Sequence, residues 1–574
     1  MARTSSIVLA GLLAGALTLT GCSRGETDGP QEQSSPVAAE TPAANSPTTS
    51  AQPDARPADF TDEANGIVAE MDDTALAGAV IMGSYDGTDA AAGAQLIRDH
   101  QLAGVIVMPY NLPQDVDRQT VGTMTEEFRT ASGERGWQTM IGVDQEGGPV
   151  TRAGSAAVEL PPLMAHGAAD DPALTSQITA LQGRDLIELG FTTDFAPVAD
   201  VTVGKGDPAI SVRSAGDDPQ RVSSVVEATV TGYDEAGIIS SLKHFPGHGA
   251  LTEDSHETLP VSQKSLDELA DRDFVPFADA AEAGVATSMM VGHIALPGDE
   301  TLPASLNPKA YQALREDVGF EGLIVTDALN MGAVTVGSPG QETVRALAAG
   351  ADLALLPPDS AAASEAVRTA LEDGTLKRED LKESATRVVA AQLWQTAVAG
   401  QSAADQSSAD QSAADQTAAD QSGEDSGPGE NELRQQLADA ALTVMTGECR
   451  FADPVDEVSV TGSDLGVKAF TEAAEEAGLK VTDSAETTVA LVPGPLLGSE
   501  TVKQAKARNS KKADVTVALS GPWELDGFDS GTQLAIYDDW RPGMTAVASY
   551  LSGDLEATGS LPVQIEGAEP PDCS

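Results

Sequence analysis

Residues 238–260 read IISSLKHFPGHGALTEDSHETLP, an apolar run followed by a loop that Gly and Pro interrupt. The run has the length and character of a buried parallel strand, and Lys243 lies near its end. The stretch also holds three of the chain's six histidines: His244, His248 and His256. Imidazole titrates near neutral pH and suits proton transfer or metal binding. The stretch therefore predicts a buried strand whose C-terminal end carries a loop of reactive side chains.

Similar apolar runs recur through the first part of the chain and make eight in all, at 76–85, 102–110, 139–146, 191–201, 238–245, 286–294, 322–329 and 351–358. Helix-length stretches such as 172–190 and 219–237 lie between most of them. Buried strands that alternate with helices predict an α/β fold with a parallel sheet. Eight such units within residues 58–400 favour a closed (β/α)8 TIM barrel over an open, doubly wound sheet.

Polar residues gather where the predicted strands end. The residues are Asp144, Asp200, Lys243, His244, His293 and Asp327. In barrels, the active site lies at the C-terminal ends of the strands. A purely structural barrel would not need a carboxylate or an imidazole at nearly every strand end, so the pattern indicates an enzyme.

Composition shifts divide the rest of the chain. Residues 23–57 are rich in Pro, Ala, Ser, Thr and Glu and predict a disordered stalk. Residues 401–430 contain an acidic repeat of five residues and predict a flexible linker, although an Ala-rich piece could be transiently helical. Residues 431–574 alternate strands with helices and predict a smaller α/β sandwich domain, in which we find no catalytic pair.

The N-terminus has the features of an export signal. Arg3 precedes the apolar run 7–21, which is too short to span a bilayer comfortably and ends at Cys22. The sequence LTGC resembles a bacterial lipobox, in which the cysteine is lipidated. Residues 1–22 therefore predict a lipoprotein signal peptide and an extracytoplasmic protein anchored to the cell membrane. A plain secretory signal is the alternative.

The net charge limits the kinds of partner that the protein can bind. The chain has 89 Asp and Glu against 33 Lys and Arg, a formal charge of -56. This charge disfavours nucleic acid as a ligand. The two remaining cysteines, Cys449 and Cys573, could form a disulfide in an exported protein or remain as thiols.

Two groups of residues indicate chemistry. Asp327 ends an apolar strand, where a carboxylate could be a nucleophile, a base, a ligand or the N-cap of a following helix. Asp254 and His256 are two residues apart, and a carboxylate beside an imidazole suits general acid/base work. Arg152 and Arg213 are further candidate donors. A metal site is the rival interpretation, but the His spacing matches no common zinc framework.

Five blocks of the sequence resemble the β-N-acetylhexosaminidases of glycoside hydrolase family 3, in the N-acetylglucosaminidase branch. They are GVDQEGGPVTR (142–152), DFAPVADV (194–201), ISVRSAGDDP (210–219), KHFPGHGALTEDSH (243–256) and GLIVTDALNMGAV (322–334). The tail GDLEATGSLPVQI (553–565) resembles the end of the family's second domain. The anchored, two-domain layout resembles that of surface lipoproteins from actinobacteria.

The resemblance implies a role for each matched residue. Asp327 would be the nucleophile, and Asp254 with His256 the acid/base pair. The grip on a terminal N-acetylglucosamine would come from Asp144, Arg152, Arg213, Lys243 and His244. The family usually has Arg where this chain has Pro149, so any contact of that Arg is lost. No metal or organic cofactor is implied, and a monomer is the default.

The sequence thus predicts an exo-acting, retaining β-N-acetylglucosaminidase that acts on muropeptides derived from peptidoglycan. Three alternatives stay open at this point. One is a phosphorylase, because an imidazole repels phosphate less than a carboxylate would. Another is a non-catalytic sugar-binding lipoprotein. The third is a β-glucosidase, which would need an acid from the second domain.

Overall fold

A computed structural model of the chain describes residues 55–133, 135, 137–334, 337–416, 429–494 and 513–573. The predicted signal peptide, Cys22 and most of the predicted stalk lie outside these ranges. Within them, no helix combines the length and the apolar character that a membrane crossing requires.

Eight parallel strands form the first domain, and each lies within one of the eight apolar runs. They are β1 (Ile81–Gly83), β2 (Gly104–Ile106), β3 (Met140–Val143), β6 (Thr193–Asp194), β7 (Ile239–Phe245), β8 (Ser288–Val291), β9 (Leu323–Thr326) and β10 (Ala354–Leu355). Their order is β10-β1-β2-β3-β6-β7-β8-β9, and a parallel bridge between Val325 and Leu353 joins the two ends of that order. The predicted barrel is therefore confirmed, and the open sheet is wrong.

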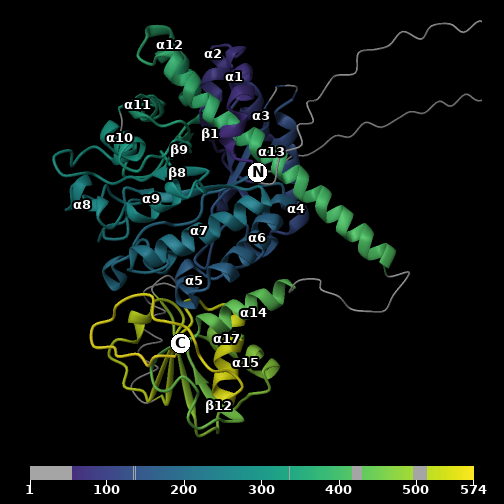
Figure 1. Cartoon of the computed structure of the whole chain (residues 1–574), viewed down its shortest axis with the longest axis vertical. Coiled ribbons are helices and arrows are strands. Elements are labelled where there is room, and N and C mark those ends of the chain that lie inside the picture. The colour runs from purple at the N-terminus through teal and green to yellow at the C-terminus, as the bar shows by residue number, and fades with distance from the viewer. Residues whose placement is uncertain are drawn as a thin grey trace, which may run out of the picture. The chain divides into compact units, whose positions relative to one another are not determined.

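At least one helix follows each strand, and eight of the helices alternate with the strands around the outside of the barrel (Figure 1). The helices are α3 (Ala90–His100), α4 (Arg118–Ala131), α6 (Pro172–Glu188), α7 (Pro219–Ala236), α9 (Val275–Glu282), α10 (Pro308–Glu316), α11 (Gln341–Ala349) and α12 (Ser360–Asp373). Asp171 and Asp218 cap the starts of α6 and α7, and Pro occupies the first turn of both. Both helices lie where the sequence predicted them.

Shorter elements decorate the barrel. Before the first strand lie the helices α1 (Thr61–Ala69) and α2 (Asp73–Gly78). The connection after β3 contains the hairpin β4 (Gln145–Gly147) and β5 (Val150–Thr151) and the helix α5 (Leu163–Ala169). The helix α8 (Leu266–Ala270) precedes α9. The hairpin and the long loop after β7 both carry residues that line the cavity described below.

Both ends of the barrel domain differ from the predicted boundaries. The predicted stalk reaches residue 57, but the Arg56 guanidinium forms an ion pair with Asp234, and the Trp394 indole donates to the Ala55 carbonyl at 2.8 Å. Trp394 belongs to α13 (Arg378–Gln416), which runs past residue 400 into the predicted linker. Alanine has the highest helix propensity, so the Ala-rich repeat continues the helix.

The second domain contains a six-stranded sheet of order β11-β16-β15-β14-β12-β13, in which only the β11–β16 pair is antiparallel. Its strands are β11 (Thr443–Thr446), β12 (Glu457–Thr461), β13 (Lys480–Val481), β14 (Thr488–Val492), β15 (Val515–Ala518) and β16 (Thr532–Ala535). Its helices are α14 (Glu430–Ala441), α15 (Asp464–Glu476) and α17 (Arg541–Ser552). The predicted second α/β domain is confirmed. A disulfide joins Cys449 and Cys573, which settles the alternative that the sequence left open.

Candidate active site

All eight residues to which the sequence analysis gave a role in catalysis or sugar binding lie around one cavity of about 340 Å³. They are Asp144, Arg152, Arg213, Lys243, His244, Asp254, His256 and Asp327. The cavity opens at the C-terminal ends of the barrel strands, as the polar residues at those ends predicted. Among the described residues, every side chain that lines it belongs to the barrel domain.

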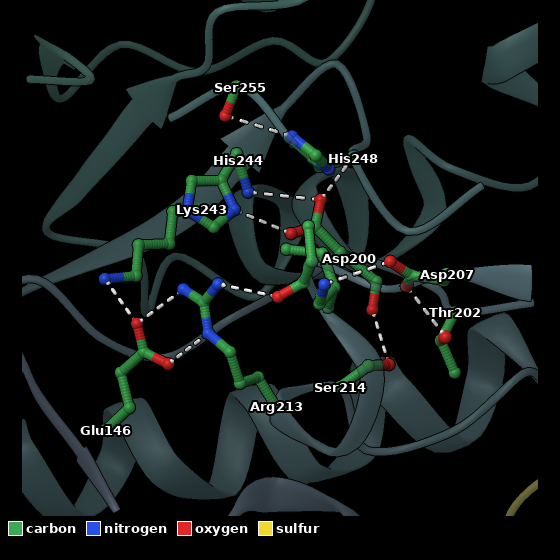
Figure 2. A network of polar contacts seen from close by, with 12 residues as sticks. Glu146, Asp200, Thr202, Asp207, Arg213, Ser214, Lys243, His244, His248 and Ser255 are labelled. Carbon is green, nitrogen blue, oxygen red and sulfur yellow. Dashed lines mark hydrogen bonds and ion pairs between the residues drawn. The ribbon is translucent and has the colours of Figure 1, made fainter. Parts of the chain in front are cut away.

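One side of the cavity is a buried set of paired charges, which we call the charged cluster: Asp144, Glu146, Arg213 and Lys243. The Lys243 Nζ atom lies 2.8 Å from Asp144 Oδ1 and 2.7 Å from Glu146 Oε1. The Arg213 Nε and Nη2 atoms each lie 2.7 Å from one oxygen of Glu146, a bidentate pair (Figure 2). Only 3% of the Lys243 side chain and 4% of the Glu146 side chain are exposed.

The paired charges keep each other ionised. Burial alone would raise the pKa of Glu146, but Arg213 and Lys243 hold it well below its ordinary value. Burial would lower the pKa of Lys243, yet Asp144 and Glu146 raise it. Buried charges of this kind persist because they are paired. The cluster therefore offers a sugar a fixed array of charged donors and acceptors.

Asp327 directly follows β9 and is 9% exposed. Its backbone N–H donates to the Val291 carbonyl at 2.9 Å, and its Oδ1 atom accepts from the Ala328 N–H at 2.8 Å. Burial raises the pKa of Asp327, but His293 and His244 outweigh burial and lower it, so the side chain is a carboxylate. Residues 328–334 form turns, so Asp327 does not cap a helix there, and that alternative is wrong.

Asp200 is a fully buried acceptor in the connection after β6, the next barrel strand after β3. It accepts hydrogen bonds from His244 Nδ1 at 2.7 Å, from the His244 backbone N–H at 3.2 Å and from the His248 backbone N–H at 2.6 Å. Burial raises the pKa of Asp200, but these two histidines lower it overall. Because Nδ1 of His244 is engaged with Asp200, Nε2 is the ring nitrogen left for the cavity.

The acid/base pair lies on the long loop after β7. The Nδ1 atom of His256 lies 2.7 Å from Asp254 Oδ1, and this oxygen also accepts the His256 backbone N–H at 2.9 Å. Burial raises the pKa of Asp254, but the two N–H groups of His256 lower it overall. The side chains of Asp254 and His256 are 42% and 65% exposed. The contact predicted from their spacing is thus present, with Nε2 of the imidazole free for proton transfer.

The hairpin β4–β5 contributes the remaining predicted donor. Arg152 follows it and lines the cavity, and the buried Nε atom of Arg152 has no hydrogen-bond partner. Pro149, the departure from the family's motif, also lines the cavity. The altered position therefore belongs to the wall of the same cavity as Arg152.

Three contributors were not among the predicted site residues: Glu146, Asp200 and His248. Glu146 lies in the block at 142–152. A count of charges in the predicted sugar-binding set would have pointed to it, because Arg152, Arg213 and Lys243 had only Asp144 as a counter-ion within that set. Asp200 was noted at a strand end without a role, and His248 was noted only as one of three clustered histidines. Their roles depend on side-chain directions, which spacing does not give.

The clustered histidines do not share a metal-like arrangement. His244 pairs with Asp200, His256 with Asp254, and His248 with the hydroxyl of Ser255 at 3.1 Å. In the described part of the chain, no group of three or more His, Cys, Asp or Glu side chains is placed to hold a metal ion. Two of the three imidazoles lie beside a carboxylate, which is the arrangement that orients a ring for proton transfer.

Comparison with known proteins identifies the family. Residues 73–391 match the N-terminal domain of glycosyl hydrolase family 3. A beta-hexosaminidase of Stenotrophomonas maltophilia is 37% identical over 239 residues, which cover 40% of this chain and 69% of that protein. A beta-hexosaminidase of Xylella fastidiosa is 33% identical over 285 residues, covering 48% of this chain and 82% of that protein.

A solved structure shares both the fold and the family. It is a glycoside hydrolase family 3 beta-N-acetylglucosaminidase from Paenibacillus sp. str. FPU-7, with a TM-score of 0.73 and 25% identity. The match covers 86% of this chain and 98% of that one, so it extends beyond the barrel. Fold, site and comparisons together define a glycoside hydrolase. The chain belongs to glycosyl hydrolase family 3.

Proposed function

We propose that this chain is an exo-acting, retaining β-N-acetylglucosaminidase that removes terminal N-acetylglucosamine from muropeptides. The observation that carries the proposal is one cavity lined by Asp327, by the Asp254–His256 pair and by the charged cluster. The relatives named beta-hexosaminidase and the Paenibacillus beta-N-acetylglucosaminidase support the choice of sugar. A volume of about 340 Å³ is small for a ligand cavity and suits one terminal sugar.

In the first step, the Asp327 carboxylate attacks the anomeric carbon while the bond to the leaving oxygen breaks. A protonated His256 donates the proton on Nε2 to that oxygen, so the aglycone departs as an alcohol. Asp254 holds Nδ1–H and thereby orients the imidazole. The products of this step are a covalent glycosyl-enzyme and a neutral His256.

In the second step, the neutral His256 takes a proton from water while the water oxygen attacks the anomeric carbon. The bond to Asp327 breaks, the carboxylate is regenerated and His256 is protonated again. Two displacements at one carbon retain the β-configuration. The separation rule for two carboxyl groups does not apply here, because the acid/base group is an imidazole.

The sugar is held by Asp144, Arg152, Arg213, Lys243 and His244 in this proposal. These five residues line the cavity. All of them except Arg152 have a side-chain partner that orients them. Glu146 joins this set indirectly, because it neutralises Arg213 and Lys243. An acid from the second domain, which a β-glucosidase of the family would need, is not among the described residues that line the cavity.

The direct test compares aryl glycosides. We expect release of p-nitrophenol from p-nitrophenyl β-N-acetylglucosaminide, little from the β-glucoside, and a β-anomer as the first product by NMR. A defined disaccharide from peptidoglycan, incubated with and without phosphate, then identifies the acceptor. Free N-acetylglucosamine in both cases supports hydrolysis, whereas sugar 1-phosphate would make the protein a phosphorylase. Binding of the sugar without turnover of any substrate would contradict an enzymatic role.

We also propose that the protein is anchored outside the cytoplasmic membrane through lipid at Cys22, as in the surface lipoproteins of actinobacteria. The apolar segment and the LTGC sequence support this proposal. Cys22→Ala should move the protein to the soluble fraction, because a lipoprotein needs its acyl chains for stable anchoring. Retention in the membrane after a high-salt wash would show another anchor.

A further inference from the structure

His248 lies in the same loop as the acid/base pair, but its ring has no part in the proposed proton transfers. The residue is 2% exposed, and burial lowers the pKa of the imidazole to about 4. The ring is therefore neutral near neutral pH and does not compete with His256 as the proton donor. Its backbone N–H is held by Asp200 Oδ1 at 2.6 Å.

The ring of His248 reaches the middle of the acid/base pair. Its Nε2 atom lies 3.1 Å from Ser255 Oγ, and Figure 2 shows this bond above the bonds that Asp200 makes to the two histidines. Ser255 is 3% exposed, whereas the side chains of its neighbours Asp254 and His256 are 42% and 65% exposed. The serine is thus a buried anchor between two exposed groups.

We propose that Asp200, His248 and Ser255 are positioning residues that fix the acid/base pair over the cavity. Asp200 holds His244 on the sugar-binding side and holds His248 by its backbone, and His248 holds Ser255. The buried Asp200 carboxylate thereby helps to position both His244, which is proposed to bind the sugar, and His256, which is proposed to donate the proton. The inference rests on the proposed function, because it assigns these contacts a role in that reaction.

The physical need for such an anchor follows from the exposure of the pair. A general acid works only when its proton is within hydrogen-bond reach of the leaving oxygen. A loop whose side chains lie in solvent has few contacts that oppose local opening. Loss of the Ser255 anchor should therefore reduce the fraction of molecules in which His256 is correctly placed, and leave the sugar-binding side intact.

The test uses variants that remove or keep the contact. Ser255→Ala removes the hydroxyl, His248→Leu removes the ring nitrogens, and His248→Gln keeps a nitrogen near the position of Nε2. Ser262→Ala is the matched control, since Ser262 is also buried and its hydroxyl bonds to Lys264 outside the cavity. Each variant is assayed with an alkyl and a p-nitrophenyl β-N-acetylglucosaminide.

We expect Ser255→Ala and His248→Leu to lower kcat on the alkyl glycoside by about tenfold, the value of one buried hydrogen bond. KM on the alkyl glycoside should stay unchanged. The aryl glycoside should lose less in kcat/KM, which reports the first step, because a good leaving group needs less protonation. His248→Gln should recover part of the loss. The double variant should lose no more than either single variant, since both remove one contact. Losses equal to those of Ser262→Ala, or equal on both substrates, would overturn the proposal.

Hydrogen exchange separates this inference from the proposed function. The Glu257 and Thr258 amides donate to the Asp254 carbonyl at 3.1 Å and report on the loop without any substrate. We expect faster exchange of the peptide spanning 250–260 in Ser255→Ala than in the wild type or in Ser262→Ala. Unchanged exchange would overturn the anchor even in an active enzyme. A wild type that cleaves neither glycoside would contradict the proposed function, and the exchange rates would still decide whether the anchor exists.

Discussion

The charged cluster and the Asp254–His256 pair line the same cavity, but the cluster is largely buried and the pair is far more exposed. Lys243 and Glu146 expose 3% and 4% of their side chains, whereas His256 exposes 65%. The cluster comes from the end of β3, the β4–β5 hairpin, β7 and a short 3-10 helix (Ser211–Arg213), and its members restrain one another. The pair lies on one loop, where Asp254 Oδ1 accepts both the backbone N–H and the Nδ1–H of His256.

The difference separates two tasks of a glycosidase. Binding a sugar requires donors and acceptors that are already in place, which a buried and paired network provides. Proton transfer to a departing aglycone requires access to solvent and to groups of variable shape, which a loop provides. Substitutions in the cluster should therefore affect folding as well as activity, and substitutions in the pair should affect activity alone.

The largest effect is expected for Asp327→Asn, at the base of the cavity. The amide cannot form the glycosyl-enzyme, so turnover should fall by about 10⁴-fold or more. The isosteric side chain still accepts from the Ala328 N–H, so the thermal midpoint should change little. Activity on the aryl glycoside and a thermal melt check both statements. Normal turnover in a stable variant would refute the assignment of the nucleophile.

His256→Ala should give the next largest loss and should depend on the leaving group. A sugar hydroxyl needs a proton in order to depart, so kcat should fall by about 10² to 10⁴ on natural substrates. A p-nitrophenolate leaves without much help, so the aryl glycoside should lose less in the first step. Water is then activated slowly, and a burst of nitrophenol should precede a slow steady state.

Azide provides the control for His256→Ala, because it attacks the glycosyl-enzyme without a base. Added azide should restore turnover of the aryl glycoside and yield a β-glycosyl azide. Equal losses on good and poor leaving groups, with no burst and no rescue, would leave His256 only a role in shaping the loop.

The sequence predicted the barrel well because its evidence is local. Each apolar run, such as 322–329, contains one strand, and the helices at 172–190 and 219–237 are bounded by Asp-Pro starts. Composition predicted a linker from residue 401, whereas α13 continues to Gln416, because composition alone does not distinguish an Ala-rich linker from the continuation of a helix.

The site was predicted in part for the same reason. Residues at strand ends, such as Asp144 and Asp327, follow from periodicity, and the Asp254–His256 contact follows from spacing. Glu146 was missed because its importance comes from Arg213, a residue distant in the sequence that only the fold brings to it. Roles of individual residues came from the family resemblance, and the geometry alone does not assign them.

Glu146→Gln tests the buried side through stability. The substitution leaves Arg213 and Lys243 with one fewer buried counter-charge, so the free energy of unfolding should fall by about 3 kcal/mol. His256→Ala, on the exposed side, is the matched control and should change it by less than about 0.5 kcal/mol. Denaturant unfolding measures both. Equal stabilities of the two variants would contradict the expected difference between the charged cluster and the Asp254–His256 pair.

We also expect the stability difference between the wild type and Glu146→Gln to depend on pH. The pKa of Glu146 is lower in the folded chain than its ordinary value of 4.5, because Arg213 and Lys243 outweigh burial. Its contribution to stability is therefore complete above that value and is lost as the pH falls below it. The stability difference between the wild type and Glu146→Gln should shrink as the pH drops below about 4.5. A difference that grows on acidification would contradict the pairing.

The smallest effect is expected for Asp254→Asn. The Oδ1 atom of Asp254 accepts both the backbone N–H and the Nδ1–H of His256, so an amide oxygen held by the same backbone N–H keeps the ring orientation. What the variant loses is a negative charge that solvent already screens, because 42% of the Asp254 side chain is exposed. Exposed ion pairs contribute up to about 1 kcal/mol, so kcat on an alkyl glycoside should fall by about fivefold. Steady-state assays with alkyl and aryl glycosides measure this loss, which should follow the same leaving-group order as His256→Ala and diminish in high salt. A loss as large as that of His256→Ala would mean that Asp254 and His256 are shielded from solvent when substrate is bound. The difference in exposure from the charged cluster would then not hold during turnover.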